Sequence, residues 1–388
     1  MTDFERINRM MKEKGVYTEP ITGKEYYTGY EYTTLYDWDQ YFEGIIQLYL
    51  GWDTRFMRNG IEIFLDLQKE NGHIQRSSKG ADVQLAEHVK PFLAQIALLI
   101  YNRDGNVDFL KANEKYYYQR MKKYILYWLN NPDNYQGLAF WDSAPHTGMD
   151  NQHERAGYWC DSFCCGVDLA SFLVRECRAF SLLGELLEEK ADALQFGIYA
   201  EEMAHRVRAM MWDEEDGFFY DIDKRTGEKI RVRYSGAFSV LWAGIATPEM
   251  AESMVTKYLQ NPKEFRRGFL YPSLAASEPG YTEEFLPNDL GCCWRANTWI
   301  PVNYYIFQGL RKYGYTELAD ELAEVTYQNV KNIGDREYYT TESKSGCGLN
   351  PFWGWSLLAY FMPYEAKSGY DPTEVYFEKN EHILKERD

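Results

Sequence analysis

Residues 36–69 read YDWDQYFEGIIQLYLGWDTRFMRNGIEIFLDLQK. Apolar residues recur every three or four positions on both sides of a short break, which predicts two amphipathic helices over 41–50 and 54–69. The break at 51–53 reads GWD, and so short a connector makes consecutive helices antiparallel neighbours. This stretch therefore predicts a helical hairpin as the repeating unit of the fold.

The same pattern recurs along the chain, and a short helix near 4–13 brings the expected number of helices to about twelve. The other expected helices span 87–101, 107–129, 166–183, 188–211, 236–242, 248–259, 298–313, 316–332 and 352–361. Connectors within a pair are short, whereas those between pairs are often long, as at 130–165 and 334–351. No run of alternating residues predicts a sheet, and no Gly/Ser-rich or Pro-rich linker divides the chain.

Repeated helical hairpins can stack as an open solenoid or close into a toroid. We favour closure, because about six hairpins fit and the polar and aromatic clusters do not recur at a fixed short repeat. The predicted fold class is all-α, an (α/α)6 toroid (six-hairpin barrel). Residues 1–388 are expected to form a single catalytic domain.

Composition argues against several functions. The chain has 388 residues, 45% of them hydrophobic, and a net charge of −17 without a basic run, so nucleic acid is not an expected partner. The longest apolar runs, such as 96–101, fall far short of the roughly 20 residues of a membrane helix. The polar N-terminus MTDFERINRMMKEKG lacks the apolar core of a secretory peptide. We therefore expect a cytoplasmic protein without a membrane partner.

The seven cysteines are odd in number, and two pairs are sequence neighbours, so we expect reduced thiols. Cys160, Cys164 and Cys165 lack a matching His or Cys group at ligand spacing. They are interpreted as small buried hydrophobic residues, and no metal is expected. Dinucleotide-binding, phosphate-binding, GxSxG and HExxH motifs are absent, so no cofactor is expected either. No pattern fixes the oligomeric state.

Connectors between helical pairs all emerge on one rim of an alternating barrel. The unusual polar and aromatic residues fall in or beside those connectors: YDWDQYFE at 36–43, LAEHVKP at 85–91, FWDSAPHTGMDN at 140–151, CCWRANTW at 292–299 and REYYTTE at 336–342. Aromatic residues make up 17% of the chain, and flat rings suit the apolar faces of sugars. Five distant clusters are thus expected at one mouth, which predicts an active site there.

Hydrolysis of a glycosidic bond needs an acid that protonates the leaving oxygen and a carboxylate that activates water or attacks carbon. The candidate acids in the clusters are Asp37, Asp39, Glu87, Asp142, Asp150, Glu337 and Glu342. Composition does not choose among them. Asp150 is favoured by its setting in TGMDN, where the glycine can bring backbone close to a ligand, although a helix cap or turn also suits an aspartate there.

These motifs resemble those of glycoside hydrolase family 63, in the family's order over most of the chain. The matching segments are YDWDQYFEGIIQLYLGW at 36–52, HVKPFLAQIAL at 88–98, TGMDN at 147–151, CWRANTWIPVNYYIFQGLRKYG at 293–314, REYYTTESKSG at 336–346 and FWGWSLL at 352–358. The resemblance implies an (α/α)6 barrel and hydrolysis with inversion, with Asp150 as general acid and Glu337 as general base. Thr-Thr follows the two tyrosines after Glu337 where the family has Asp-Pro, so Glu342 stays an alternative base.

A small α-linked glucoside or mannoside, including glycosyl-glycerates, is the substrate class that the resemblance implies. The expected substrate-binding residues are Tyr36, Trp38, Asp39, His88, Trp141, Asn151, Trp294, Arg295, Trp299 and Trp355. Inversion requires the two carboxyl groups to lie roughly 6.5–9.5 Å apart, with space for a water molecule. The pKa of Asp150 is expected to be raised, by burial beside Trp141 or by a neighbouring carboxylate.

Two other functions stay open on the sequence. A sugar epimerase or isomerase on a related barrel would use a histidine pair, and His88, His146 and His153 lie in the mouth clusters. A carbohydrate-binding protein with an inactive carboxylate pair would bind its ligand without hydrolysis.

Overall fold

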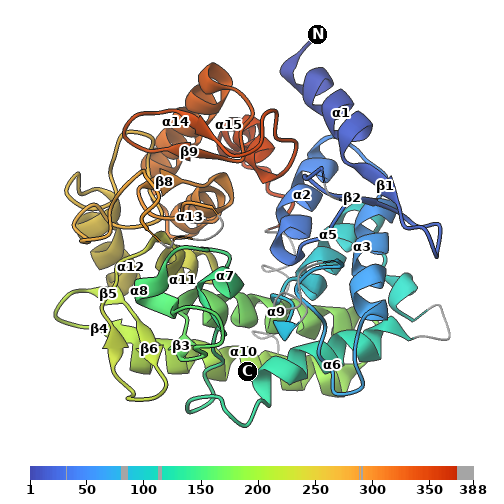
Figure 1. The fold of residues 1–388 in the computed structure, drawn as a ribbon. Coiled ribbons are helices and arrows are strands. Elements are labelled where there is room, and N and C mark those ends of the chain that lie inside the picture. The colour runs from blue at the N-terminus through green and yellow to red at the C-terminus, as the bar shows by residue number, and fades with distance from the viewer. Residues whose placement is uncertain (32, 80–85, 112–115, 288, 290–291, 374–388) are drawn as a thin grey trace.

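The computed structural model describes residues 1–31, 33–79, 86–111, 116–287, 289 and 292–373, and its helices form two layers around a ring (Figure 1). The inner layer consists of α2 (Asp37–Tyr49), α5 (Leu93–Asp104), α9 (Val167–Leu186), α11 (Ser239–Trp242), α13 (Ile300–Lys312) and the 3-10 helix η5 (Trp355–Tyr360). Each of these elements packs against the next, and η5 packs back against α2. The ring is therefore closed, as in the predicted toroid, and not an open solenoid.

The outer layer covers this ring. It consists of α3 (Arg55–Asp66), α6 (Tyr117–Leu129), α10 (Lys190–Arg206), α12 (Pro248–Met254) and α14 (Thr316–Ile333), with α1 (Asp3–Lys14) and α15 (Met362–Ser368) packed beside η5. The two layers differ in how many of their helix faces are buried, and this difference follows their hydrophobic patterns. Inner helices such as α9 and α13 bury residues on all sides, whereas α3 and α14 are amphipathic and bury one face.

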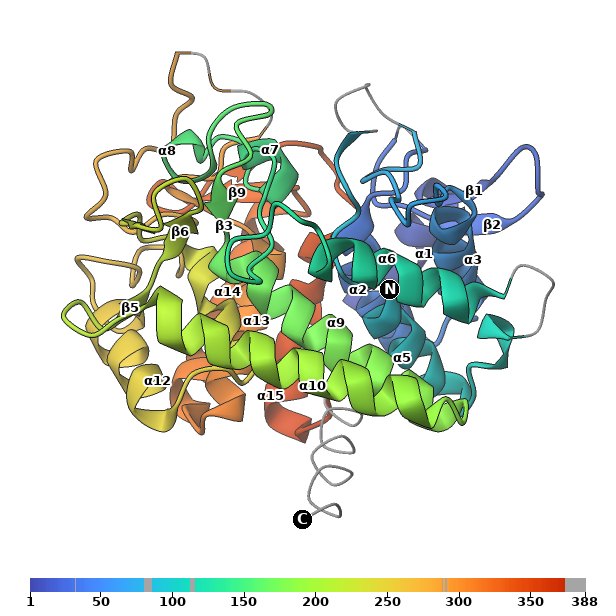
Figure 2. The same cartoon turned by 90° about the horizontal axis from the view of Figure 1, so that it is seen from below.

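Short strands decorate one end of the barrel, together with the one-turn helices α7 (Ala144–Thr147) and α8 (His153–Ala156) (Figure 2). The strands are β1 (Val16–Thr18), β2 (Glu25–Tyr27), β3 (Cys164–Cys165), β4 (Trp212–Asp213), β5 (Phe218–Phe219), β6 (Asp221–Asp223), β7 (Lys229–Ile230), β8 (Asn297–Thr298), β9 (Tyr338–Thr340) and β10 (Gly346–Cys347). The sequence did not predict them, because two or three residues are too few to show alternation. The antiparallel sheet β10–β9–β8 matters most, since it pairs Thr298 with Tyr339 and so brings two mouth clusters together.

Several predicted helices have different bounds in the structure. The helix expected over 87–101 begins only at Leu93, because a proline at 91 disfavours helical backbone at the residue before it. The helix expected over 107–129 is a 3-10 turn, η1 (Asp108–Leu110), followed by α6. The π-helical segments η2 (Val207–Met211) and η4 (Val255–Leu259) extend α10 and α12, and the 3-10 helix η3 (Ser235–Phe238) precedes α11.

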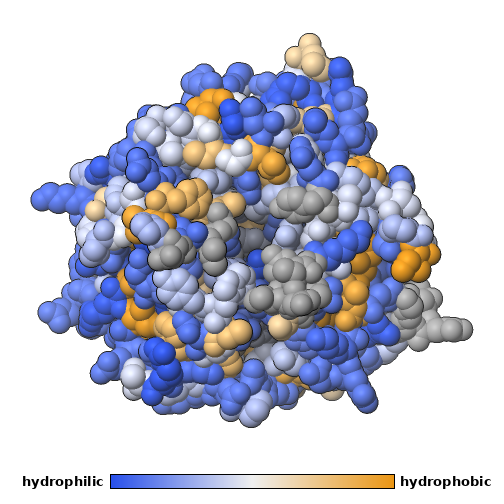
Figure 3. Space-filling view, in the orientation of Figure 1, coloured by the Kyte–Doolittle hydropathy of each residue, from blue (hydrophilic) through white to orange (hydrophobic). Residues whose placement is uncertain are grey.

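The face in the view of Figure 3 is largely hydrophilic, with hydrophobic residues in small scattered groups. Within the described part of the chain, no helix combines the length and the apolar composition that crossing a membrane requires.

Candidate active site

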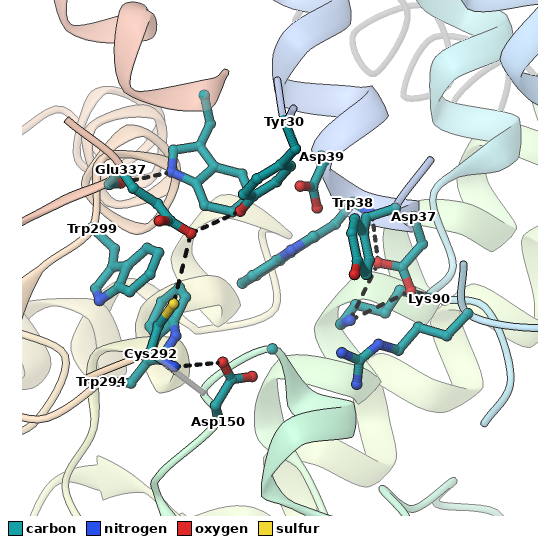
Figure 4. A pocket seen from close by; sticks show the side chains of 14 residues that line it. Tyr30, Asp37, Trp38, Asp39, Lys90, Asp150, Cys292, Trp294, Trp299 and Glu337 are labelled. Carbon is teal, nitrogen blue, oxygen red and sulfur yellow. Dashed lines mark hydrogen bonds and ion pairs between the residues drawn. The ribbon is translucent and has the colours of Figure 1, made fainter. Parts of the chain in front are cut away.

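One pocket collects residues that are far apart in the sequence (Figure 4). Its volume is about 150 Å³, smaller than the roughly 300–1,000 Å³ of pockets for drug-sized ligands. It is lined by Tyr30, Tyr36, Asp37, Trp38, Asp39, Arg76, Lys90, Gly148, Asp150, Cys292, Trp294, Trp299, Glu337 and Trp355. Tyr36 to Asp39, Trp299 and Trp355 stand at or just before the first turn of an inner element, so the N-terminal ends of α2, α13 and η5 face the pocket.

Asp150 enters the pocket from the loop that follows α7. Gly148 ends α7 in a left-handed conformation, with φ of +89°, and a Cβ there would lie 2.7 Å from the ring of Trp38. Only glycine therefore lets this loop approach Trp38 so closely. The main-chain N–H of Cys292 donates a hydrogen bond of 3.0 Å to Oδ2 of Asp150 and fixes its carboxyl group.

The pKa of Asp150 is raised to about 6. Burial is the main cause, and the nearby carboxylate of Glu337 also raises this pKa, whereas the charges of Arg76 and Lys90 oppose the shift. The expected rise is confirmed. The surroundings of Asp150 differ from the expectation that it is buried beside Trp141, because Trp141 does not line the pocket.

Glu337 faces Asp150 across the pocket and immediately precedes β9 (Figure 4). Its Oε1 accepts hydrogen bonds from the Tyr30 hydroxyl at 3.1 Å and the Cys292 thiol at 3.6 Å, and its Oε2 accepts one from the N–H of Leu349 at 3.2 Å. Gly348 also has a positive φ of +69°, and a Cβ there would lie 2.3 Å from Oε2. Burial raises the pKa of Glu337, and the three donors offset part of that rise.

Aromatic rings form a wall beside the two carboxyl groups. Trp294 and Trp299 stack with ring centroids 3.6 Å apart, and Trp299 stacks in turn on Tyr338 at 4.5 Å. Trp38 lies 6.0 Å from Trp294, and Trp355 closes the wall near Trp299. Flat, rigid surfaces of this kind match the C–H faces of a sugar ring.

The first turn of α2 supplies two more carboxyl groups. Asp37 is paired with Lys90, whose main-chain N–H and Nζ donate to it at 2.9 and 3.2 Å. Asp39 is 4% exposed, and among the described residues none donates a side-chain hydrogen bond to its carboxyl group. Burial and the charge of Asp37 raise the pKa of Asp39 well above its ordinary value. Asp39 is thus a polar group with hydrogen-bonding capacity left for a ligand.

Tyr36, Trp38, Asp39, Trp294, Trp299 and Trp355 line the pocket as expected, together with Asp150 and Glu337. Four expected binding residues do not line it: His88, Trp141, Asn151 and Arg295. These four are buried supports behind the lining.

Each support is held by a specific contact. The ring of His88 hydrogen-bonds the backbone at 74 and 124, and burial lowers its pKa to about 3. Trp141 donates to a carboxylate at the start of α9 at 2.8 Å. Asn151 accepts from the N–H of Trp294 at 2.7 Å, and Arg295 pairs with Asp289 and Glu154 at 3.2 and 2.8 Å.

Glu342, the alternative base, lies outside the pocket lining. Its carboxylate accepts from Arg267 at 2.6 Å and from the Tyr281 hydroxyl at 2.7 Å, on a surface where its side chain is 37% exposed. The structure therefore brings Glu337, and not Glu342, into contact with the residues around Asp150.

Sequence reasoning missed Tyr30, Arg76, Lys90 and Cys292 as lining residues. Lys90 and Cys292 stood out only as members of the mouth clusters at 85–91 and 292–299, and Cys292 was also expected to be a reduced thiol. Arg76 reaches the pocket because it pairs with Glu87 at 2.8 Å and donates to the main-chain carbonyl of Pro145 in α7. Tyr30 and Arg76 stand outside the mouth clusters, and within the clusters no sequence signal separates Lys90 and Cys292 from their neighbours.

The cysteines carry free thiols. Cys164 and Cys165 are buried as expected, but Cys160 is exposed, so its interpretation as a buried residue was wrong. Among the described residues, no group of three or more His, Cys, Asp or Glu side chains is arranged to hold a metal ion.

Asp150→Asn is expected to stabilise the folded protein above pH 6. The pKa of Asp150 is about 6 in the folded state, against about 3.9 when unfolded, so ionisation is disfavoured by folding. The penalty is absent below pH 4, grows between pH 4 and 6, and reaches up to about 3 kcal/mol above that range. Asparagine does not ionise and avoids it. Melting temperatures of both proteins at pH 4 and pH 8 measure the effect; a gap that does not widen with pH contradicts it.

Much of this sequence is similar to that of known proteins. The family model described as the mannosylglycerate hydrolase MGH1-like glycoside hydrolase domain matches residues 32–356. A mannosylglycerate hydrolase of Thermus thermophilus is 30% identical over 196 residues, 50% of this chain and 44% of that protein. A cytosolic neutral trehalase of Saccharomyces cerevisiae is 24% identical over 379 residues, 78% of this chain and 49% of that protein. The alignments thus span about half the length of these curated relatives.

The fold has a solved counterpart in a GH63 mannosylglycerate hydrolase from another strain of Thermus thermophilus, in complex with glucose. The two structures agree with a TM-score of 0.74 at 20% identity, over 92% of this chain and 99% of that chain. This agreement confirms the predicted (α/α)6 fold, and the family match confirms the resemblance seen in the motifs. The chain belongs to the MGH1-like glycoside hydrolase domain family.

Proposed function

We propose that this protein is an inverting glycosidase that hydrolyses a small α-linked mannoside or glucoside in one displacement. Asp150 gives its proton to the glycosidic oxygen while Glu337 takes a proton from the water that attacks the anomeric carbon on the opposite face. The bond between that carbon and the leaving oxygen breaks as the bond to water forms. The supporting observation is the position of these two carboxyl groups on opposite sides of one aromatic-walled pocket (Figure 4).

The environments of the two carboxyl groups suit different roles. Burial keeps a large fraction of Asp150 protonated near pH 6, as an acid requires. Glu337 accepts three hydrogen bonds, which favour its ionised form and hold it in one orientation, as a base requires. Asymmetric tuning of two acids is how a single site supplies both an acid and a base.

The rate is expected to follow a bell-shaped dependence on pH. Activity falls above about pH 6, because Asp150 must carry a proton, and falls at low pH, because Glu337 must be ionised. Since burial raises the pKa of Glu337, the acidic limb lies above its ordinary value of 4.5. Initial rates between pH 4 and pH 8 give kcat/KM for the free enzyme. A rate that still rises at pH 8 argues against Asp150 as the acid.

The sugar that is cleaved is assigned to the aromatic side of the pocket. Trp294, stacked on Trp299, offers a flat face for the ring, and Trp38 extends this aromatic wall 6.0 Å from Trp294. Asp39 also lines the pocket, and its buried carboxyl group, whose raised pKa favours the protonated form, is available to hydrogen-bond sugar hydroxyl groups. Leaving a buried polar group without its matching sugar hydroxyl costs binding free energy. Asp39 is therefore expected to discriminate between sugar epimers.

The leaving group is assigned to the side of Asp150, since the acid contacts the leaving oxygen. Arg76 and Lys90 both act on Asp150 through their charge, so this side carries two cationic groups. The Arg76 guanidinium is fixed by Glu87 and suits a carboxylate. We therefore extend the proposal to an anionic leaving group such as glycerate, in line with the relatives named mannosylglycerate hydrolase.

A matched pair of substrates tests this assignment. Mannosylglycerate and neutral mannosylglycerol differ by one carboxylate, and the wild-type enzyme is expected to prefer the former by at least about tenfold in kcat/KM, since a charged hydrogen bond contributes roughly 1.5–3 kcal/mol. The preference is expected to weaken at high salt. Equal rates for the pair contradict an anionic leaving group, and no release of sugar from either, or from α-glucosides and trehalose, contradicts the hydrolase itself.

The lining supports the rival functions less well. None of the described histidines lines the pocket, so an epimerase that works with a histidine pair finds no such pair there. The other rival, a carbohydrate-binding protein without activity, would bind these substrates but release no sugar from them. We also propose one catalytic domain over residues 1–388 that acts in the cytoplasm without a cofactor, which agrees with a relative named as cytosolic.

A further inference from the structure

Cys292 touches both members of the proposed carboxyl pair (Figure 4). Its main-chain N–H donates to Oδ2 of Asp150 at 3.0 Å, and its thiol donates to Oε1 of Glu337 at 3.6 Å. The side chain lines the pocket between them. A single residue therefore connects the acid to the base.

The thiol is a donor because it stays protonated: burial, and then the charge of Glu337, raise its pKa far above the ordinary value. Tyr30 donates to the same oxygen of Glu337 at 3.1 Å, so Oε1 accepts two hydrogen bonds. A carboxylate oxygen has two acceptor sites, which Cys292 and Tyr30 fill on Oε1. The N–H of Leu349 takes one site on Oε2 and leaves the other for water.

We propose that Cys292 is a positioning residue for this pair, with its amide holding Asp150 and its thiol holding Glu337. The inference rests on the proposed function and adds a role for a residue outside the carboxyl pair. A thiol is a weaker donor than a hydroxyl. It therefore orients Glu337 while lowering the basicity of its carboxylate less than a serine would.

Substitutions at 292 separate the two limbs of the pH profile. Cys292→Ala removes a donor to ionised Glu337, so the acidic limb of kcat/KM should move up by roughly 0.5–1 pH unit. Cys292→Ser restores a donor, so its limb should return to the wild-type position or lie below it. The basic limb should stay in place in both variants, because the amide that holds Asp150 is retained.

The neighbouring thiol provides the matched control. Cys293 contacts Asn151 and the carbonyl of Glu284 and neither carboxyl group of the pair, so Cys293→Ser should move neither limb. Tyr30→Phe, which removes the other donor to Oε1, should move the acidic limb upward as Cys292→Ala does. If Cys292→Ala is too unstable to assay, as a much lower melting temperature would show, Tyr30→Phe still tests the hydrogen bonds to Oε1 of Glu337.

A measurement without turnover keeps the inference distinct from the proposed function. A ¹³C titration of glutamate-labelled protein, with the Glu337 signal identified by its loss in Glu337→Gln, should show the same upward shift of the Glu337 pKa in Cys292→Ala. An unchanged titration overturns the positioning role whether or not the protein hydrolyses glycosides. A shifted titration in a protein that cleaves no glycoside supports the contact and rejects the proposed function.

Discussion

Asp150→Asn is expected to lower kcat for an α-glycoside of an ordinary alcohol by about 10²–10⁴-fold, the usual contribution of general acid catalysis. The alkoxide is a poor leaving group without a proton, and the asparagine amide has none to give. Asparagine is isosteric and still accepts the N–H of Cys292, so the fold and KM should change little. Initial rates on mannosylglycerate, with circular dichroism as a check of folding, measure the loss.

The leaving group distinguishes a lost acid from a damaged site. A glycosyl fluoride or nitrophenyl glycoside departs without protonation, so Asp150→Asn should retain far more activity on it than on mannosylglycerate. A uniform loss on both substrates points to a structural role for Asp150. Full activity of Asp150→Asn on both substrates would contradict the assignment of Asp150 as the general acid.

Glu337→Gln is expected to lower kcat by at least about 10²–10⁴-fold on every substrate, including those with activated leaving groups. Glutamine cannot take the proton of the attacking water, whatever the leaving group. The loss should therefore not depend on the substrate, in contrast to Asp150→Asn. The amide oxygen can take the place of Oε1 and still accept from Tyr30 and Cys292, with loss of the hydrogen bond from Leu349, so the variant should fold.

Glu342→Gln is the matched control for that substitution. Both glutamates belong to the segment REYYTTE, but Glu342 is paired with Arg267 and Tyr281 on the surface. Breaking an exposed ion pair costs only about 0–1 kcal/mol of stability, and turnover should stay near the wild-type rate. If Glu342→Gln were inactive and Glu337→Gln active, the base would have to be reassigned.

The architecture was predictable because helical periodicity and connector length are local properties. The segment 36–69 forms α2 and α3, joined at the expected short break, and the long connectors do gather at one end of the barrel. The short strands were not predictable, since they depend on contacts between distant segments such as β8 with β9, and the helix expected over 352–361 is shorter and has 3-10 form in η5.

The site was predictable cluster by cluster but not residue by residue. In TGMDN, Asp150 lines the pocket while Asn151 supports the backbone of Trp294. In CCWRANTW, Trp294 lines the pocket while Arg295 pairs with acidic residues behind the lining. In these turn and loop segments neighbouring side chains point to different sides, so a motif mixes lining and supporting side chains. Arg76 was missed for a different reason, as its loop reaches the pocket only through tertiary contacts.

The anomer released first is the most direct test of a base that activates water. Proton NMR spectra, recorded within minutes of adding the enzyme to an α-mannoside or α-glucoside and before the free sugar mutarotates, resolve the two anomers. Direct attack by water that Glu337 activates predicts that the β anomer appears first. If the α anomer appeared first, the bond would be broken with retention, and a carboxylate acting as nucleophile would replace the single displacement argued above.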